Sequence, residues 1–94
     1  MAEAETITRR QTTARVKGII AKKKNRRLSQ ILLRHNLRTD LRFTTAAVRG
    51  LAVPINDAFG RFNARITTKE AGDTKTVLDL RDLVWKRIPA ARKA

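Results

Sequence analysis

The feature that most constrains the fold is a capped amphipathic run from Thr44 to Gly72. Thr44 is a suitable N-cap, and Phe43 before it and Val48 after it have the spacing of a hydrophobic staple. We expect one helix of roughly 40 Å, kinked by Pro54. Its apolar residues follow the 3.6-residue rhythm of an α-helix: Val48, Leu51, Ala52, Ile55, Ala58, Phe59, Phe62 and Ile66.

A shorter helix is expected on each side of the long one. On the N-terminal side, Asn25 is expected to cap a helix whose apolar stripe includes Leu28 and Ile31. On the C-terminal side, Asp79 is expected to cap a helix that Pro89 stops. The predicted fold class is therefore all-α, in the order short helix, loop, long central helix, loop, short helix.

The two ends of the chain are expected to be tails. Residues 1–25 are Thr-rich and basic and lack sustained apolar periodicity, so we expect a disordered basic N-terminal tail. The helical domain is expected to span residues 26–88, and residues 89–94 to form a short basic C-terminal tail. The acidic start MAEAET lacks the apolar region of a signal peptide, and no apolar run approaches the length of a membrane span.

The long helix predicts a second chain. Two short helices cannot cover a helix of that length, so a monomer would expose a large apolar stripe. The economical solution is a second copy, or a similar chain, that crosses the long helix in an interlocked dimer. The residues expected at that partner interface are Leu51, Ile55, Phe59, Phe62 and Trp85.

The charge points to a polyanionic partner. The chain has 22 Lys and Arg against 8 acids, a net charge of +14 that repels itself unless an anion lies nearby. Residues 1–25 carry seven basic and two acidic groups, residues 26–52 six and one, and residues 53–88 seven and five. Nucleic acid is the default partner for such a balance, with an anionic membrane second. There is no Cys, so a disulfide or a thiolate metal site is excluded, and we expect no cofactor.

Arg42 is the sharpest candidate for contact with nucleic acid. It lies between Leu41 and Phe43, which we expect to anchor the loop in the core and so to direct Arg42 outward at the start of the long helix. A fixed arginine beside helix-end amides suits a narrow, phosphate-lined groove. The alternative is an exposed arginine that caps a neighbour or only adds solubility.

The order of these segments resembles the core histone H-three family. The segment RTDLRF, followed by AVRGL, is similar to the first loop and second-helix start of that family, TRRQTTARVKG to its N-terminal tail, and KTVLDLRDLVWKRI to its second loop and third helix. The resemblance implies a histone fold that forms an interlocked handshake heterodimer with a histone H-four-like partner. With the other core histones, this pair would wrap and compact duplex DNA in a nucleosome-like particle. The implied location is the chromosome in the nucleus, or viral chromatin or the virion if a virus encodes the chain.

The resemblance also implies roles for single residues. Arg42 matches the loop arginine that enters the DNA minor groove, and Thr76 resembles the loop threonine that pairs with it. Lys75 and Asp82 match a basic–acidic pair that ties the second loop to the third helix. The rest of the predicted DNA-binding set is Arg26, Arg27, Arg38, Arg49 and Lys75.

Three departures from the family stand out. The segment before the fold is too short for the full extra helix that the family carries there. Pro54 is foreign to the second helix. Gly72 stands where the family has a histidine in its self-association bundle, so a weaker tetramer is expected.

Other function classes fit the residues less well. An enzyme is not predicted, since the chain has one His, one Ser and no Cys, and His35 is expected at a helix end. A ribosomal or other basic RNA-binding protein is the main alternative, because runs such as AKKKNRR are common there. Such proteins usually show aromatic platforms, whereas the phenylalanines here fit core positions. A bacterial nucleoid protein is the third alternative.

Overall fold

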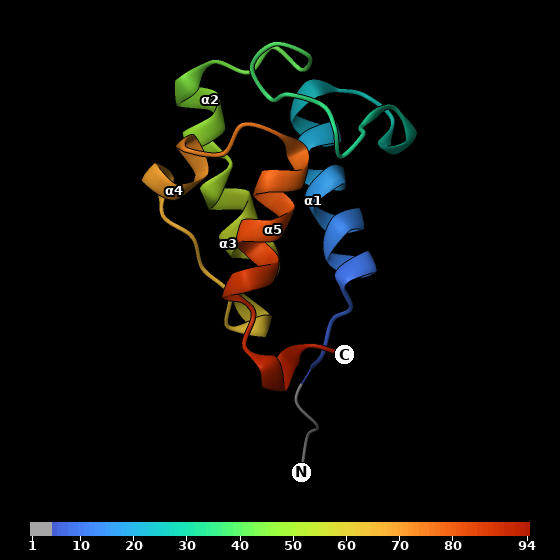
Figure 1. The fold of residues 1–94 in the computed structure, drawn as a ribbon, viewed down its shortest axis with the longest axis vertical. Helices are drawn as coiled ribbons and strands as arrows, with labels where there is room; N and C mark the ends of the chain where they lie inside the picture. The colour runs from blue at the N-terminus through green and yellow to red at the C-terminus, as the bar shows by residue number, and fades with distance from the viewer. Residues whose placement is uncertain (1–4) are drawn as a thin grey trace.

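The computed structural model describes residues 5–94, and helices make up most of it (Figure 1). No strand forms within these residues, which confirms the predicted all-α class. Isolated bridges join Ile7 to Lys93 and Asn36 to Thr76. The described α-helices are α1 (Arg9–Lys24), α2 (Thr45–Gly50), α3 (Ala52–Phe59), α4 (Thr68–Gly72) and α5 (Val77–Arg87), with short 3₁₀ turns at Leu28–Gln30, Gly60–Phe62 and Ala90–Arg92.

The helices pack around a single core. Helix α1 packs on both α5 and α3, and α4 packs on α2 and α3 (Figure 1). Helices α1 and α5 are antiparallel, because Thr13 meets Arg81 while Arg9, earlier in α1, meets Trp85, later in α5. The helices contribute fully buried side chains to this core, including Val16, Ile20, Val48, Leu51, Ile55, Phe59, Leu80 and Val84.

Helix α1 occupies most of the segment that was predicted to be a disordered tail. That prediction is wrong for residues 9–24, and residues 1–4 of the tail lie outside the described range. Thr8 and Gln11 form a reciprocal capping box at the start of the helix. Val16 and Ile20, one turn apart, are 0% exposed. Burial of these two side chains against other elements supplies the stabilisation that the local sequence lacks.

Asn25 ends helix α1 and does not begin the next one. Its φ of 52° is left-handed, and the N–H of Arg26 donates to the carbonyl of Ala21 at 2.9 Å, as in a Schellman motif. The short helix predicted after Asn25 is therefore wrong. A 3₁₀ turn and a loop replace it, and Ile31 and Leu37 fill the core from that loop with 1% and 0% exposure.

The long central helix is present only in part. Leu51, between α2 and α3, keeps helical dihedral angles (φ −64°, ψ −20°), so these helices form one kinked unit. Pro54 has no N–H to give to the carbonyl of Gly50, which explains the break and confirms the predicted kink. Thr44 caps this unit as predicted, with its hydroxyl accepting from the N–H of Ala47.

The prediction that this helix continues to Gly72 is wrong. The chain leaves it after the turn at Gly60–Phe62, where Asn63 is left-handed (φ 59°). The side chain of Asn56 then holds the returning chain, since its amide donates to the Ile66 carbonyl at 2.9 Å and its oxygen accepts from the Ile66 N–H at 2.8 Å. Helical structure resumes only as the short helix α4.

Helix α5 has the predicted place but a different cap. Thr76 is the N-cap and Asp79 lies three residues on, where the two form a capping box. The predicted cap at Asp79 is therefore wrong by three residues. The helix ends at Arg87, before Pro89 as predicted, and buries Leu80 and Val84.

The predicted C-terminal tail is folded against the start of the chain. The N–H of Ile7 donates to the Arg92 carbonyl at 2.8 Å, and the N–H of Ala94 donates to the Ile7 carbonyl at 3.0 Å. Ile7 is 1% exposed. The segment around Ile7 and the C-terminal residues therefore lie at the same pole of the described structure (Figure 1).

Four of the five residues expected at a partner interface lie in this chain's own core, and the fifth, Trp85, is half-buried against it. Leu51, Ile55, Phe59 and Phe62 are 0% to 3% exposed, because α1 and α4 pack on α3 and α4 also packs on α2. The exposed stripe that predicted a second chain is thus covered within one chain. The argument for an obligate dimer from exposed apolar surface no longer applies, and pairing stays a prediction of the resemblance.

Gly18 tests whether α1 is folded in solution. It lies inside α1, and a Cβ placed there would have nothing within 4 Å. We expect Gly18→Ala to raise the free energy of unfolding by about 1 kcal/mol and Gly18→Pro to lower it by about 3 kcal/mol. Urea unfolding followed by circular dichroism measures both. If neither substitution changes the midpoint, residues 9–24 are a tail.

Candidate nucleic-acid interface

A group of cations gathers where α1 ends. We call it the α1-end cluster: Lys22, Lys23, Lys24, Arg26, Arg27 and Arg42. Lys24 connects α1 to the loop that carries Arg42, because its Nζ donates to the Arg42 carbonyl at 3.1 Å. The same Nζ lies 4.4 Å from the ring centroid of Phe43. Apart from the half-buried Lys24, the side chains of the cluster are exposed.

No acid forms a salt bridge with the cluster within residues 5–94. Residues 6–39 contain 11 Lys and Arg and no Asp or Glu. Within residues 5–94 the salt bridges engage Arg61, Arg81 and Arg87, all outside the cluster. Asp40 is the acid closest in sequence, and its carboxylate accepts from the backbone N–H of Asn36 at 2.7 Å. The cluster therefore presents a positive field that favours a polyanion.

Arg42 has the orientation that its neighbours predicted. Leu41 and Phe43 are 1% and 6% exposed, whereas Arg42 itself is exposed. Its backbone has a φ of 57°, in the left-handed region, which costs a residue with a side chain about 1–2 kcal/mol. Within residues 5–94 its guanidinium makes no hydrogen bond and no salt bridge. A strained backbone that displays an unengaged cation is typical of a functional position.

A second loop joins this end of the molecule through Leu37. The N–H of Leu37 donates to the Lys75 carbonyl at 2.8 Å, and the Leu37 carbonyl accepts from the N–H of Phe43 at 2.9 Å. The loop of Lys75 and the loop of Arg42 are therefore held side by side. Lys75 is exposed and lies beside the loop of Arg42, so it joins the candidate surface, and its contact with DNA stays a prediction.

One predicted DNA contact, Arg38, has a structural role, and a second, Arg49, lies close to it. Arg38 is half-buried, and its guanidinium donates to the carbonyls of Gly72 at 2.7 Å and Thr74 at 3.2 Å, where it closes the C-terminal end of α4. Arg49 packs over Gly72, so that a Cβ at Gly72 would lie 2.7 Å from its Cγ. Arg38 and Arg49 thus both lie against the C-terminal end of α4, and the contact of the exposed Arg49 with DNA stays a prediction.

The predicted ion pair between Lys75 and Asp82 is wrong. Asp82 accepts from Nε of Arg81, its neighbour in sequence, at 2.7 Å. The hydroxyl of Thr76 is also engaged, because it accepts from the N–H of Asp79 as the cap of α5. Thr76 is therefore a capping residue, and nothing in the described residues pairs it with Arg42.

The lysines of the cluster and the surroundings of Trp85 were not foreseen. A Lys run directly before an Asn is typical of a helix C-terminus, and this signal could have placed Lys22, Lys23 and Lys24 on a folded surface. Trp85 is half-buried, with Arg9 at 5.6 Å and Lys93 at 4.7 Å from its ring centroid. It faces cations of its own chain.

Other kinds of site find little support among residues 5–94. No group of three His, Cys, Asp or Glu side chains is placed to hold a metal ion there. Nor does this range contain a helix both long and apolar enough for a membrane crossing. His35 stabilises a turn, since its Nδ1 accepts from the N–H of Leu32 at 3.0 Å.

Comparisons with known proteins do not assign the chain to a family. A scan against models of protein families and a search of curated proteins both find no match. The functional argument therefore depends on the geometry and charge described above, and on the resemblance of the loop and tail segments.

Arg42 allows fold and binding to be separated. We expect Arg42→Gly to raise the free energy of unfolding by up to about 1 kcal/mol, because glycine adopts a positive φ without strain. Arg42→Val should lower it by about 1–2 kcal/mol, because a β-branched residue fits this region poorly. Both variants should bind duplex DNA roughly fivefold more weakly, a loss of about 1 kcal/mol. Thermal melts and fluorescence anisotropy measure the two effects. If Arg42→Gly destabilises the fold and leaves DNA affinity unchanged, Arg42 is a structural residue.

Proposed function

We propose that this protein is a non-enzymatic, histone-like protein that binds and compacts duplex DNA without reading its base sequence. The observation that carries the proposal is Arg42. It projects from a strained backbone position between two buried anchors, and Lys24 ties it to a cluster of cations with no acid paired to it. Such an arrangement suits a regular array of phosphates.

The size and charge of the molecule fit a short length of duplex. Duplex DNA carries one negative charge per about 1.7 Å of its axis, so a net charge of +14 corresponds to roughly 24 Å of DNA. The molecule measures 45 × 27 × 18 Å. One chain would therefore neutralise somewhat less than one helical turn, which is about 34 Å.

The residues of the interface would make two kinds of contact with DNA. Lys22, Lys23, Arg26 and Arg27 are exposed cations on and just after the last turn of α1, and they would contact phosphates. Arg42, with its backbone fixed, would enter a narrow minor groove, where negative potential is highest. Such contacts position the protein on DNA and favour deformable sequences over any particular base.

RNA remains the alternative ligand class. The rings that could stack on bases face inward or are covered, since Phe43, Phe59 and Phe62 are at most 6% exposed. Recognition of single-stranded RNA usually needs such rings. The burial of the phenylalanines therefore favours duplex DNA.

Handshake pairing with a histone H-four-like partner is a second candidate. The form of the loop at Leu41, Arg42 and Phe43 favours it, because these residues carry the most specific part of the resemblance. The handshake needs a continuous central helix. To form that helix, α3 and α4 would have to join through residues 60–67, and side chains that are now buried would become exposed.

Reversal of charge in the cluster tests the DNA-binding proposal. We expect the affinity for a random-sequence duplex to fall about 10³-fold or more between 50 and 200 mM salt if six or more phosphates are contacted. The double variant Lys22→Glu/Lys23→Glu should reduce the slope of log affinity against log salt by about 2. The matched control Lys69→Glu/Lys86→Glu makes the same change of net charge at exposed lysines of α4 and α5. Equal effects of the two variants, or tighter binding to structured RNA, would contradict the proposal.

Sedimentation of the isolated chain tests the pairing. Since the described core closes within one chain, we expect a folded monomer whose thermal midpoint does not change with protein concentration. Mixture with a histone H-four-like protein should leave the monomer peak in place. A stable heterodimer, or a midpoint that rises with concentration, would favour the handshake arrangement.

A further inference from the structure

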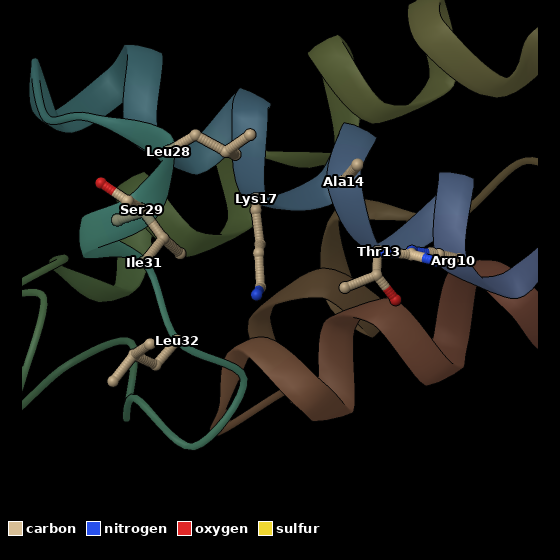
Figure 2. Close-up of a pocket in the computed structure, with 8 residues that line it drawn as sticks. All are labelled: Arg10, Thr13, Ala14, Lys17, Leu28, Ser29, Ile31 and Leu32. Atoms are coloured by element: carbon tan, nitrogen blue, oxygen red, sulfur yellow. The ribbon is translucent and has the colours of Figure 1, made fainter.

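An open groove lies between α1 and the segment 28–32, on a different part of α1 from the cluster (Figure 2). Its volume is about 510 Å³. Arg10 and Lys17 line it from α1, and Leu28 and Leu32 line it from the facing segment. Figure 2 shows the side chain of Lys17 extending from α1 toward the segment that carries Leu32.

The groove concentrates exposed apolar surface. Leu28 and Leu32 are 48% and 36% exposed, and they are two of the four large hydrophobic residues that are exposed within residues 5–94. Leu78 is a third, and its N–H donates to the carbonyl of Leu33 at 2.9 Å, which places it next to this segment. Exposed leucines gathered beside one groove mark an interaction surface.

The charge of the groove is positive. Within residues 5–94 neither Arg10 nor Lys17 forms a salt bridge. They are seven residues apart on one helix, a rise of about 10 Å along its axis. Between them, Thr13 is already engaged by Arg81, which donates to its hydroxyl at 2.9 Å.

We propose that this groove docks an acidic amphipathic helix of a partner protein. The helix would place leucine-like side chains on Leu28 and Leu32 and two carboxylates, about two turns apart, on Arg10 and Lys17. Duplex DNA fits the groove less well, because its phosphates gain nothing from contact with the exposed leucines. A helix with an apolar face flanked by carboxylates complements both the exposed leucines and the two cations of the groove. The proposal does not depend on the DNA-binding function.

A designed peptide tests the proposal. The probe is a 14-residue helix with leucines on one face and glutamates at positions 3 and 10, and its control has glutamine at both positions. Titration into the ¹⁵N-labelled full chain should shift the amide signals of residues 10–17 and 28–32. We expect the glutamine control to bind at least tenfold more weakly.

Variants separate the groove from the DNA surface. Leu28→Ser/Leu32→Ser and Lys17→Glu should each weaken the peptide at least tenfold, while the leucine variant keeps its affinity for DNA. Lys22→Glu should weaken DNA binding and leave the peptide unaffected. Thermal melts confirm folding, and Lys17→Glu alone suffices if the leucine variant unfolds. The proposal is overturned if both peptides bind alike or if the shifts map to the α1-end cluster. It is equally overturned if duplex DNA or anionic vesicles, and not the peptide, show the dependence on Leu28 and Leu32.

Discussion

The packing of α1 on the rest of the chain is the interaction on which the structure depends. Val16 and Ile20 lie at 0% exposure in a core that they share with α3 and α5. This contact covers apolar side chains of α3 that would otherwise need a second chain. It also brings Lys24 to the loop of Arg42, so that the cations at the end of α1 and Arg42 form one surface. Loss of the contact would therefore remove both the closed core and the candidate DNA-binding site.

Elements whose signal is local could be predicted from the sequence. Thr44 caps α2, Pro54 breaks the backbone ladder at Gly50, and Pro89 follows the end of α5, each through short-range backbone chemistry. The outward direction of Arg42 was predicted for the same reason, since the burial of its two neighbours leaves no other side for it. The left-handed backbone at Arg42 could not be predicted, because that position holds neither glycine nor asparagine, the residues that usually indicate it.

Elements that depend on tertiary contacts could not be predicted in this way. In the composition of residues 9–24 the cations outnumber the three buried apolar side chains, so the segment resembles a tail, although the capping box of Thr8 and Gln11 was a local signal of a helix. The helical rhythm continued through residues 60–67, yet the side chain of Asn56 bonds the Ile66 backbone and holds that segment out of a helix. The predicted Lys75–Asp82 ion pair does not form, because Asp82 pairs with Arg81, its neighbour in sequence.

The structure also shows how a small fold tolerates so much positive charge. Three of its four aromatic rings have a cation over them: Arg15 on Phe62, Lys24 on Phe43, and Arg9 with Lys93 on Trp85. In each case the stem of the side chain can cover apolar surface while its charged end meets the negative face of a ring. These contacts attach cations to the core but leave their mutual repulsion in place. A bound polyanion would relieve that repulsion, and ligand binding would then stabilise the fold by mass action. The charge that favours DNA binding is thus also the part of the sequence that opposes folding of the free chain.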